Sequence, residues 1–236
     1  MSDLTNPEVV LACRGVSAGY GPITVIRDID LEVRKGEVVA IIGPNGAGKT
    51  STLLTLAGEL TPSAGEIELL GRTTTDPMHV RCRNGLGFVT EERSVIMDLS
   101  ARDNLRLANV SDADAIALFP ELERLMGRKA GLLSGGEQQM LTLARVLGRK
   151  SQVILADELS LGLAPIIVTR LLTALRTAAD ERGLGVLLVE QHVRQALKVA
   201  DRVYVMQRGK IVLSGSSVEI QSRLSEIEAA YLSSAV

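Results

Sequence analysis

The sequence predicts an α/β protein with a parallel-sheet core, an antiparallel β subdomain near its amino terminus and a small helical insert. Three observations lead to this prediction. Apolar, β-branched runs alternate with helical segments, which is typical of a parallel sheet covered by helices. Period-two alternation precedes the first buried run, which favours antiparallel strands there. Between about residues 91 and 133 the β-branched runs disappear and helix formers dominate.

The first part of the chain, residues 9–42, is expected to form antiparallel strands that lead into a buried one. Residues 29–33 read Ile-Asp-Leu-Glu-Val and alternate with a period of two, and the next three residues predict a turn. Val38–Ile42 is continuously apolar, as expected of a parallel strand buried on both faces. A helix is expected to follow over Ser51–Ala57.

The remaining elements follow from the same patterns. A turn is expected over Thr61–Gly65, with strands at Glu66–Leu70 and Leu86–Val89. The predicted insert holds helices at Ala101–Ala108, Asp112–Leu118 and Pro120–Met126. After it come helices at Gln138–Leu147 and Ile166–Glu181, strands at Val153–Ala156 and Val186–Val189, a hairpin of Val203–Met206 with Ile211–Leu213, and a closing helix at about 217–232. The predicted domains are therefore an α/β core with the antiparallel β subdomain (1–90 and 134–236) and a helical insert (91–133).

The composition of the 236 residues excludes several classes of protein. The chain is 46% hydrophobic and 23% charged with a formal net charge of −2, an ordinary globular balance without the basic excess of nucleic-acid-binding surfaces. Cys13 and Cys82 match neither disulfide nor zinc spacings and are expected to be reduced structural thiols. Neither a signal peptide nor an apolar run of ~20 residues is evident, so a cytoplasmic chain is expected, with any membrane role depending on a partner.

Residues 43–50 read Gly-Pro-Asn-Gly-Ala-Gly-Lys-Thr and match the Walker A pattern of phosphate-binding loops. A predicted buried strand precedes the loop and a predicted helix follows it, which is the context that the pattern requires; otherwise it would be a glycine-rich turn with a solvated lysine. Such loops hold ATP by backbone N–H groups and the helix amino terminus. The expected ATP-binding residues here are Gly43, Pro44, Asn45, Gly46, Ala47, Gly48, Lys49, Thr50 and Ser51. Lys49 is expected to bridge the β- and γ-phosphates during catalysis, and the Thr50 hydroxyl to hold Mg²⁺.

Two acidic residues, Asp157 and Glu158, end the predicted strand Val153–Ala156. On their own they would be the start of a solvated loop. Beside a phosphate-binding loop, Asp157 can orient Mg²⁺ through its water shell, and Glu158 can act as the general base for the attacking water.

The run Leu-Ser-Gly-Gly-Glu-Gln-Gln begins at residue 133 and opens a predicted helix. Ser134 and Glu137 have the spacing of a capping box, which is a purely structural explanation for both residues. A capping box does not explain Gly135 and Gly136, because glycine destabilises a helix. Two exposed glycines at a helix amino terminus would make a second phosphate site.

This run is the signature motif of ABC-type ATPases, and Ser134 stands 23 residues before Asp157 (157 − 134), as expected for one helix and one strand. The chain resembles the nucleotide-binding subunit of an ABC transporter from end to end. The resemblance implies that two such subunits pack head to tail. Ser134 and Gly136 of one subunit, with Gly135 between them, would then contact the γ-phosphate held by the Walker A loop of the other.

The resemblance also assigns roles to three single residues. Tyr20 stands where the family places an aromatic ring that stacks on adenine, although a tyrosine near a sheet edge can also be a core residue. His192 follows the strand Val186–Val189 at the position of the switch histidine, where a lone histidine would otherwise be structural or exposed. Glu91 replaces the usual glutamine of the Q-loop and is expected to sense the γ-phosphate through Mg²⁺ or water.

Two further departures from the family pattern follow Glu158. Leu159 replaces a proline, and Ser160–Pro165 reads Ser-Leu-Gly-Leu-Ala-Pro in place of Ser-Ala-Leu-Asp, so the aspartate that acts in trans is absent. The chain resembles the smaller ATPase of branched-chain amino acid importers in several places. These are the Ser160–Pro165 segment, Glu91, Gln-Ala-Leu-Lys-Val-Ala-Asp-Arg at 195–202 and the terminal Ala-Tyr-Leu. The insert is somewhat shorter than is usual in that branch.

The resemblance implies the ATP-hydrolysing subunit of an ABC importer for branched-chain or other small amino acids, on the cytoplasmic face of the membrane. Its implied partners are integral membrane permease subunits, a second ATPase subunit (identical or related) and, indirectly, a periplasmic solute-binding protein. Urea or another amide remains an alternative cargo. A soluble ABC ATPase acting on nucleic acid or ribosomes is also an alternative, but such chains commonly carry two ATPase halves or a long coiled-coil insert. Glu158 and His192 argue against a regulator that barely hydrolyses ATP.

Overall fold

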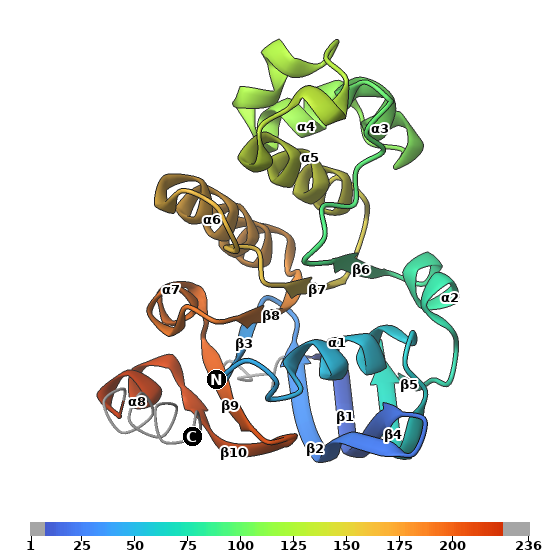
Figure 1. Cartoon of the computed structure of the whole chain (residues 1–236), viewed down its shortest axis with the longest axis vertical. Helices are drawn as coiled ribbons and strands as arrows, with labels where there is room; N and C mark the ends of the chain where they lie inside the picture. The colour runs from blue at the N-terminus through green and yellow to red at the C-terminus, as the bar shows by residue number, and fades with distance from the viewer. Residues whose placement is uncertain (1–7, 224–236) are drawn as a thin grey trace, which may run out of the picture.

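A computed structural model describes residues 8–223, and its larger sheet carries the predicted α/β core. This sheet has six strands in the order β10-β9-β3-β8-β7-β6 (Figure 1). The strands are β3 (Val38–Ile42), β6 (Leu86–Val89), β7 (Val153–Asp157), β8 (Gly185–Glu190), β9 (Arg202–Gln207) and β10 (Lys210–Ser216). All neighbouring pairs are parallel except β9 and β10, which form the predicted hairpin. The fold class predicted from the sequence is confirmed.

Every residue of β3, β7 and β8 is buried, because both faces of the sheet are covered. Alternate residues of β3 point into two different cores. Val38, Ala40 and Ile42 belong to a core that includes residues of α5 (Gly135–Leu147) and α6 (Pro165–Arg182). Val39 and Ile41 belong to a second core, which includes residues of α1 (Lys49–Ala57) and the antiparallel sheet.

The antiparallel sheet has the order β2-β1-β4-β5 and packs on the α1 side of the core (Figure 1). Its strands are β1 (Val9–Tyr20), β2 (Ile23–Arg34), β4 (Pro62–Leu69) and β5 (Arg72–Thr73). The prediction of a turn over Thr61–Gly65 is wrong, because Pro62 begins β4 and pairs with Ala18 of β1. A proline at the first residue of a strand removes no essential ladder bond.

The remaining helices include some that the sequence did not predict. They are α2 (Met78–Arg83), α3 (Ala101–Leu107), α4 (Asp112–Leu118), α7 (Val193–Val199), α8 (Ser217–Ser222) and the 3₁₀ helices η1 (Pro120–Leu125) and η2 (Ala130–Leu132). β5, α2, η2 and α7 were not predicted from the sequence, and η1 replaces the α-helix predicted over Pro120–Met126. The predicted closing helix and terminal Ala-Tyr-Leu extend beyond residue 223 and there lie outside the described residues.

The helices between residues 91 and 133 gather with α5 at one end of the molecule, away from the antiparallel sheet (Figure 1). Phe119, Leu122 and Leu125 are buried in this part of the core. The boundaries proposed for an insert, at 90/91 and 133/134, remain predictions. Within residues 8–223, no helix is both long enough and apolar enough to cross a membrane.

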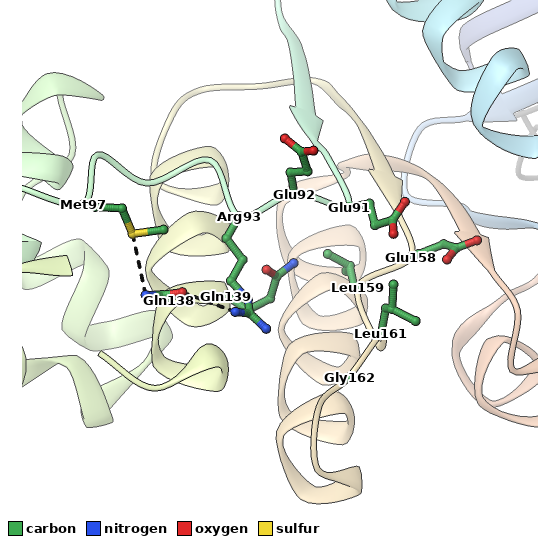
Figure 2. A pocket seen from close by; sticks show the side chains of 10 residues that line it. All are labelled: Glu91, Glu92, Arg93, Met97, Gln138, Gln139, Glu158, Leu159, Leu161 and Gly162. Atoms are coloured by element: carbon green, nitrogen blue, oxygen red, sulfur yellow. Dashed lines mark hydrogen bonds between the residues drawn. The ribbon is translucent and has the colours of Figure 1, made fainter. Parts of the chain in front are cut away.

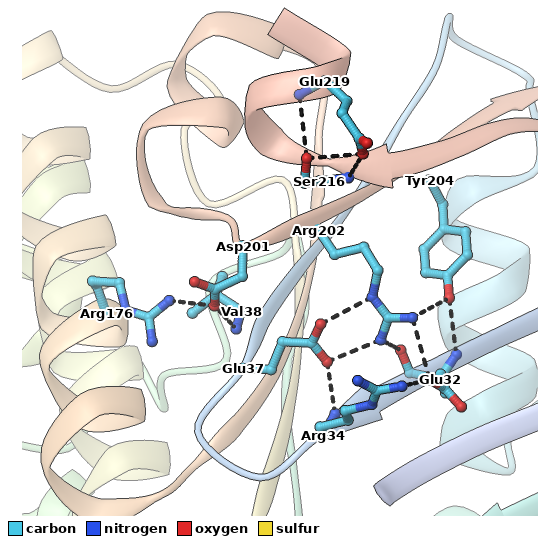
Figure 3. Close-up of polar contacts among 10 residues, drawn as sticks. All are labelled: Glu32, Arg34, Glu37, Val38, Arg176, Asp201, Arg202, Tyr204, Ser216 and Glu219. Carbon is cyan, nitrogen blue, oxygen red and sulfur yellow. Dashed lines mark hydrogen bonds and ion pairs between the residues drawn. The ribbon is translucent and has the colours of Figure 1, made fainter. Parts of the chain in front are cut away.

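A polar network joins the two sheets at the amino end of β3, opposite the end that leads to the glycine loop (Figure 3). Arg202 donates to both carboxylate oxygens of Glu37 at 2.9 Å and to the backbone oxygen of Glu32 at 2.9 Å. Asp201 accepts a hydrogen bond from the backbone N–H of Val38 at 2.8 Å and one from Arg176 at 2.6 Å. The network fixes where β3 begins relative to β2 and β9.

Candidate functional site

The glycine loop joins β3 to α1, as the sequence predicts, and its last glycine has a conformation that other residues rarely adopt. Gly48 is the N-cap of α1 and has φ 103°. A Cβ atom at this position would lie 2.9 Å from Cγ2 of Ile26 in β2, so the loop and β2 approach closely only because the residue is glycine. The amino terminus of α1 therefore faces the loop, with its backbone N–H groups directed at whatever the loop holds.

Lys49 is the first residue of α1, and its side chain lies beneath the loop. The residue is 5% exposed, and Nζ donates hydrogen bonds to the backbone oxygens of Gly43 at 3.0 Å and Pro44 at 3.2 Å. Nζ also lies 3.8 Å from Oε1 of Glu158. Burial lowers the pKa of Lys49, while the charges of Glu158 and Asp157 oppose that shift. The ammonium group is thus held at the meeting point of the loop and the carboxylates.

A cavity of about 500 Å³ opens beside this ammonium group. Its lining residues come from the loop, β2 and the ends of three core strands: Val25, Asn45, Gly46, Gly48, Lys49, Thr50, Ser51, Glu91, Glu158, Leu161 and Gln191. Eight of these were predicted from the sequence as site residues. The other predicted residues are not in the lining. Gly43, Pro44 and Ala47 belong to the loop itself and Asp157 ends β7, whereas Tyr20, His192 and the signature residues come from other elements.

The two acidic residues at the end of β7 differ in their surroundings. Asp157 is 3% exposed, and burial raises its pKa to about 6, with Glu158 and Glu91 adding to the shift and the Thr50 hydroxyl opposing it. Glu158 has φ 46°, an unusual backbone conformation for a residue with a side chain, and Oε2 accepts a hydrogen bond from Nε2 of Gln191 at 2.7 Å. Such strain is common at functional sites.

The residues predicted for Mg²⁺ are consistent with a hydrated cation. Oδ1 of Asp157 is buried and has no hydrogen-bond partner within the part of the chain that the structure describes, so a ligand atom is available. Across residues 8–223 there is no group of three or more His, Cys, Asp or Glu residues arranged to hold a metal. A magnesium ion at Asp157 and Thr50 would therefore take most of its ligands from water and phosphate oxygens, as it commonly does.

Glu91 lies where this cavity meets a second one of about 540 Å³ (Figure 2). The second cavity lies between α5 and the loop after β7, and both cavities share Glu91, Glu158 and Leu161. Arg93 and Gln138 line it on the α5 side and are hydrogen-bonded at 3.4 Å. Leu159, which replaces the expected proline, is 1% exposed and part of the core, so an apolar residue of either kind suits the position.

The signature run begins α5 with the predicted capping box. Ser134 is the N-cap, its backbone N–H donates to Oε2 of Glu137 at 2.8 Å, and the backbone N–H of Glu137 donates to the Ser134 hydroxyl at 3.4 Å. A Cβ atom at Gly135 would lie 2.6 Å from Nη2 of Arg93, and one at Gly136 would lie 3.1 Å from Ile167. The Arg93 guanidinium is the end of a long side chain that can move aside, whereas Ile167 would have to yield, so packing gives a further reason for glycine at 136 but not at 135. Within one chain, the signature does not meet the glycine loop.

Tyr20 and His192 are both exposed at the ends of strands. Tyr20 is 51% exposed at the end of β1, on the same hairpin as Val25, which lines the first cavity. His192 is the N-cap of α7, and its side chain has no hydrogen-bond partner among residues 8–223. Gln191 was missed as a site residue, although the argument applied to its neighbour His192, a position at the carboxyl end of a parallel strand, also covers it.

We expect Tyr20→Ala to weaken ATP binding by about 1–3 kcal/mol, because a base stacked on an aromatic ring loses that much when the ring is removed. Tyr20→Phe should be nearly silent, since the exposed ring face is kept. Titration of a fluorescent ATP analogue measures both variants. If the phenylalanine variant binds as poorly as the alanine variant, the hydroxyl rather than the ring is responsible, and stacking is excluded.

Comparison with known proteins shows what the chain is similar to. Residues 26–160 match the family described as ABC transporter. The chain is 40% identical to a high-affinity branched-chain amino acid transport ATP-binding protein, BraG of Pseudomonas aeruginosa, covering 84% of this chain and 89% of the relative. It is 35% identical to a lipopolysaccharide export system ATP-binding protein, LptB of Acidithiobacillus ferridurans, covering 89% and 92%. A solved structure titled as the ATP-binding subunit of an ABC transporter superposes with a TM-score of 0.82 at 25% identity, covering 94% and 99%.

Proposed function

Because the chain belongs to the ABC transporter family and is an ATPase subunit of it, we propose that it drives an importer of branched-chain or other small amino acids. The observation that carries the ATPase part of the proposal is the buried Lys49 ammonium group between the glycine loop and Glu158, in a cavity lined by five other predicted loop residues (Asn45, Gly46, Gly48, Thr50 and Ser51). The chain is proposed to lie on the cytoplasmic face of the membrane, where its partners are integral membrane permease subunits and, through them, a periplasmic solute-binding protein. No nucleic acid is involved.

The proposed chemistry assigns each group at the cavity one task. The loop N–H groups and Lys49 hold the phosphates and neutralise charge that builds up on the γ-phosphoryl oxygens. Asp157 and Thr50 would hold Mg²⁺, which supplies further charge neutralisation when bound. Glu158 accepts a proton from water as the water oxygen bonds to the γ-phosphorus and the bond to the β–γ bridging oxygen breaks, leaving ADP and phosphate. Gln191 orients the Glu158 carboxylate through its 2.7 Å hydrogen bond.

A second subunit, identical or related, is part of the proposed site. Ser134 is exposed at the amino terminus of α5 and does not reach the cavity of its own chain. The helix amino terminus carries partial positive charge, which suits a phosphate. We therefore propose that Ser134, Gly135 and Gly136 complete the ATP site of a partner subunit, and that ATP closes the pair. His192 is proposed to contact the same γ-phosphate after closure.

Amino acid import is preferred over export because BraG is similar at 40% identity and because residues 160–165 resemble the importer branch. The similarity to LptB at 35% identity makes an export system the second candidate. Urea or another small amide is a further possible cargo of an importer.

The direct test is reconstitution of the chain with its permease subunits in proteoliposomes that contain ATP. A matching binding protein loaded with labelled leucine, isoleucine or valine should stimulate ATP hydrolysis. The labelled amino acid should then accumulate through transport by the complex. The Lys49→Ala complex is the control and should show neither. The proposal would be contradicted if amino acids did not stimulate hydrolysis and the same complex extracted lipid in an ATP-dependent manner. That pair of results would support the exporter.

Glu91→Gln should alter coupling more than binding. Glu91 is exposed at the junction of the two cavities and lies beside Arg93, which contacts α5. Neutralising it should leave ATP affinity within about tenfold, or about 1.4 kcal/mol, but change the stimulation of hydrolysis by the permease. ATP titration and hydrolysis with and without permease measure the two effects. Equal stimulation of wild type and variant would count against this role.

A further inference from the structure

A second buried carboxylate lies beside the proposed catalytic base and has no task in the chemistry above. Glu190 is the last residue of β8 and is 0% exposed. Its two carboxylate oxygens both bind Ser160, Oε2 accepting from the hydroxyl at 2.6 Å and Oε1 from the backbone N–H at 3.2 Å. Burial raises the pKa of Glu190 to about 7, with the charges of Glu158 and Asp157 adding to the shift and the Ser160 bonds opposing it. A carboxylate in such a place is costly to keep.

The end of β8 is hydrogen-bonded to the segment after β7 at both Glu158 and Ser160. The backbone oxygen of Val189 accepts from the N–H of Glu158 at 2.9 Å, Glu190 binds Ser160, and Gln191 donates to the Glu158 carboxylate at 2.7 Å. Three consecutive residues of one strand end therefore contact the segment from Glu158 to Ser160.

These hydrogen bonds constrain the backbone conformation at Glu158. Glu158 has φ 46°, a region that residues with side chains rarely adopt. The Val189 bond holds the backbone N–H of Glu158 itself, and the Glu190–Ser160 pair holds the chain two residues later, so the unusual conformation lies between two fixed points. Beyond Ser160 the loop carries Leu161, which lines both cavities.

We infer that Glu190 is a positioning residue for ATP hydrolysis, because its two hydrogen bonds to Ser160 fix the backbone that directs the Glu158 carboxylate into the cavity. The inference rests on the proposed role of Glu158 as the base. It predicts that Glu190 and Ser160 act as one unit on turnover and leave ATP affinity unchanged, since neither residue lines the cavity.

The test compares Ser160→Ala, Glu190→Leu, Glu190→Gln and the Ser160→Ala/Glu190→Leu double variant in the full chain. Ser160→Ala removes one hydroxyl and should lower kcat about tenfold with KM for ATP within twofold. Glu190→Leu should lower kcat at least as much, and the double variant should be no slower than Glu190→Leu, because coupled residues are not additive. Glu190→Gln should recover most of the turnover, since its amide can accept from the Ser160 N–H and donate to its hydroxyl.

Ser217→Ala is the matched control. Ser217 also donates a short hydrogen bond, at 2.7 Å to the backbone oxygen of Leu197, but it lies in α8 away from both cavities. This variant should keep wild-type kcat and KM, whatever its melting temperature. If Glu190→Leu does not fold, Ser160→Ala and Glu190→Gln still decide the question.

The inference is overturned by an unchanged kcat in Ser160→Ala and Glu190→Leu, or by a double variant whose loss is the product of the single losses. A lowered melting temperature with unchanged kcat at 15–20 °C, roughly the range of greatest stability for many proteins, would show a structural role alone and also overturn it. The proposed function fails separately, if the wild-type chain with its permease hydrolyses no ATP or is not stimulated by an amino acid.

Discussion

Lys49→Ala is expected to remove ATP binding, with a loss of affinity of more than about 100-fold, or about 2.7 kcal/mol. Lys49 is 5% exposed, and its ammonium group is already bonded to two loop carbonyls. The group is therefore held in place for phosphate oxygens, and loop N–H groups alone cannot replace its charge. Its removal also leaves the carboxylates of Asp157, Glu158 and Glu190 without the nearby cation that offsets their negative charge. The uncompensated charge would repel phosphate further.

Equilibrium binding of labelled ATP measures this loss. Lys210→Ala is the matched control, because Lys210 is an exposed lysine in β10 outside both cavities, and it should bind like the wild type. Unchanged affinity of Lys49→Ala would remove Lys49 from the site.

Glu158→Gln is expected to lower hydrolysis by about 10²–10⁴-fold, the range that general base catalysis contributes. An amide keeps the shape of the carboxylate, and its oxygen can still accept the hydrogen bond from Gln191. It is a very poor base, however, so a proton can no longer leave the attacking water. The groups proposed to bind ATP are untouched, and affinity should therefore stay within about threefold, or about 0.7 kcal/mol.

Single-turnover hydrolysis and ATP titration of the same preparation separate these two quantities. Glu181→Gln, which neutralises an exposed glutamate of α6, is the control for loss of one negative charge and should hydrolyse ATP normally. Residual hydrolysis at the wild-type rate in Glu158→Gln would show that another group is the base.

The strands of the core were predictable from the sequence because they are buried on both faces and therefore continuously apolar. Elements that depend on contacts far along the chain were not. The short helix α2 is one example, since Arg81 is 2% exposed and donates to backbone oxygens of Leu56 and Asp76, which the local sequence does not reveal. Thr61–Gly65 has turn-forming residues, but pairing of Pro62 and Ala64 with β1 makes it a strand.

The candidate site was predictable where a motif places its residues together in sequence. The glycine loop, the two acids at the end of β7 and the capping box at Ser134 are local patterns of this kind. The contacts of Glu158 with Gln191, and of Ser160 with Glu190, join residues about thirty positions apart and depend on β7 and β8 being neighbours. The packing of Gly135 against Arg93 is hidden from the sequence for the same reason.

The measurement that tests the central claim most directly is the mass of Glu158→Gln in solution by size-exclusion chromatography with light scattering. The claim is that one ATP is held between Lys49 of one subunit and Ser134 of another. A ligand that binds both subunits stabilises their association by mass action. The variant should be a monomer without nucleotide and with ADP, and a dimer with ATP, alone or with a related ATP-binding subunit of the same transporter. A variant that stays monomeric in saturating ATP, both alone and with the related subunit, would contradict the account.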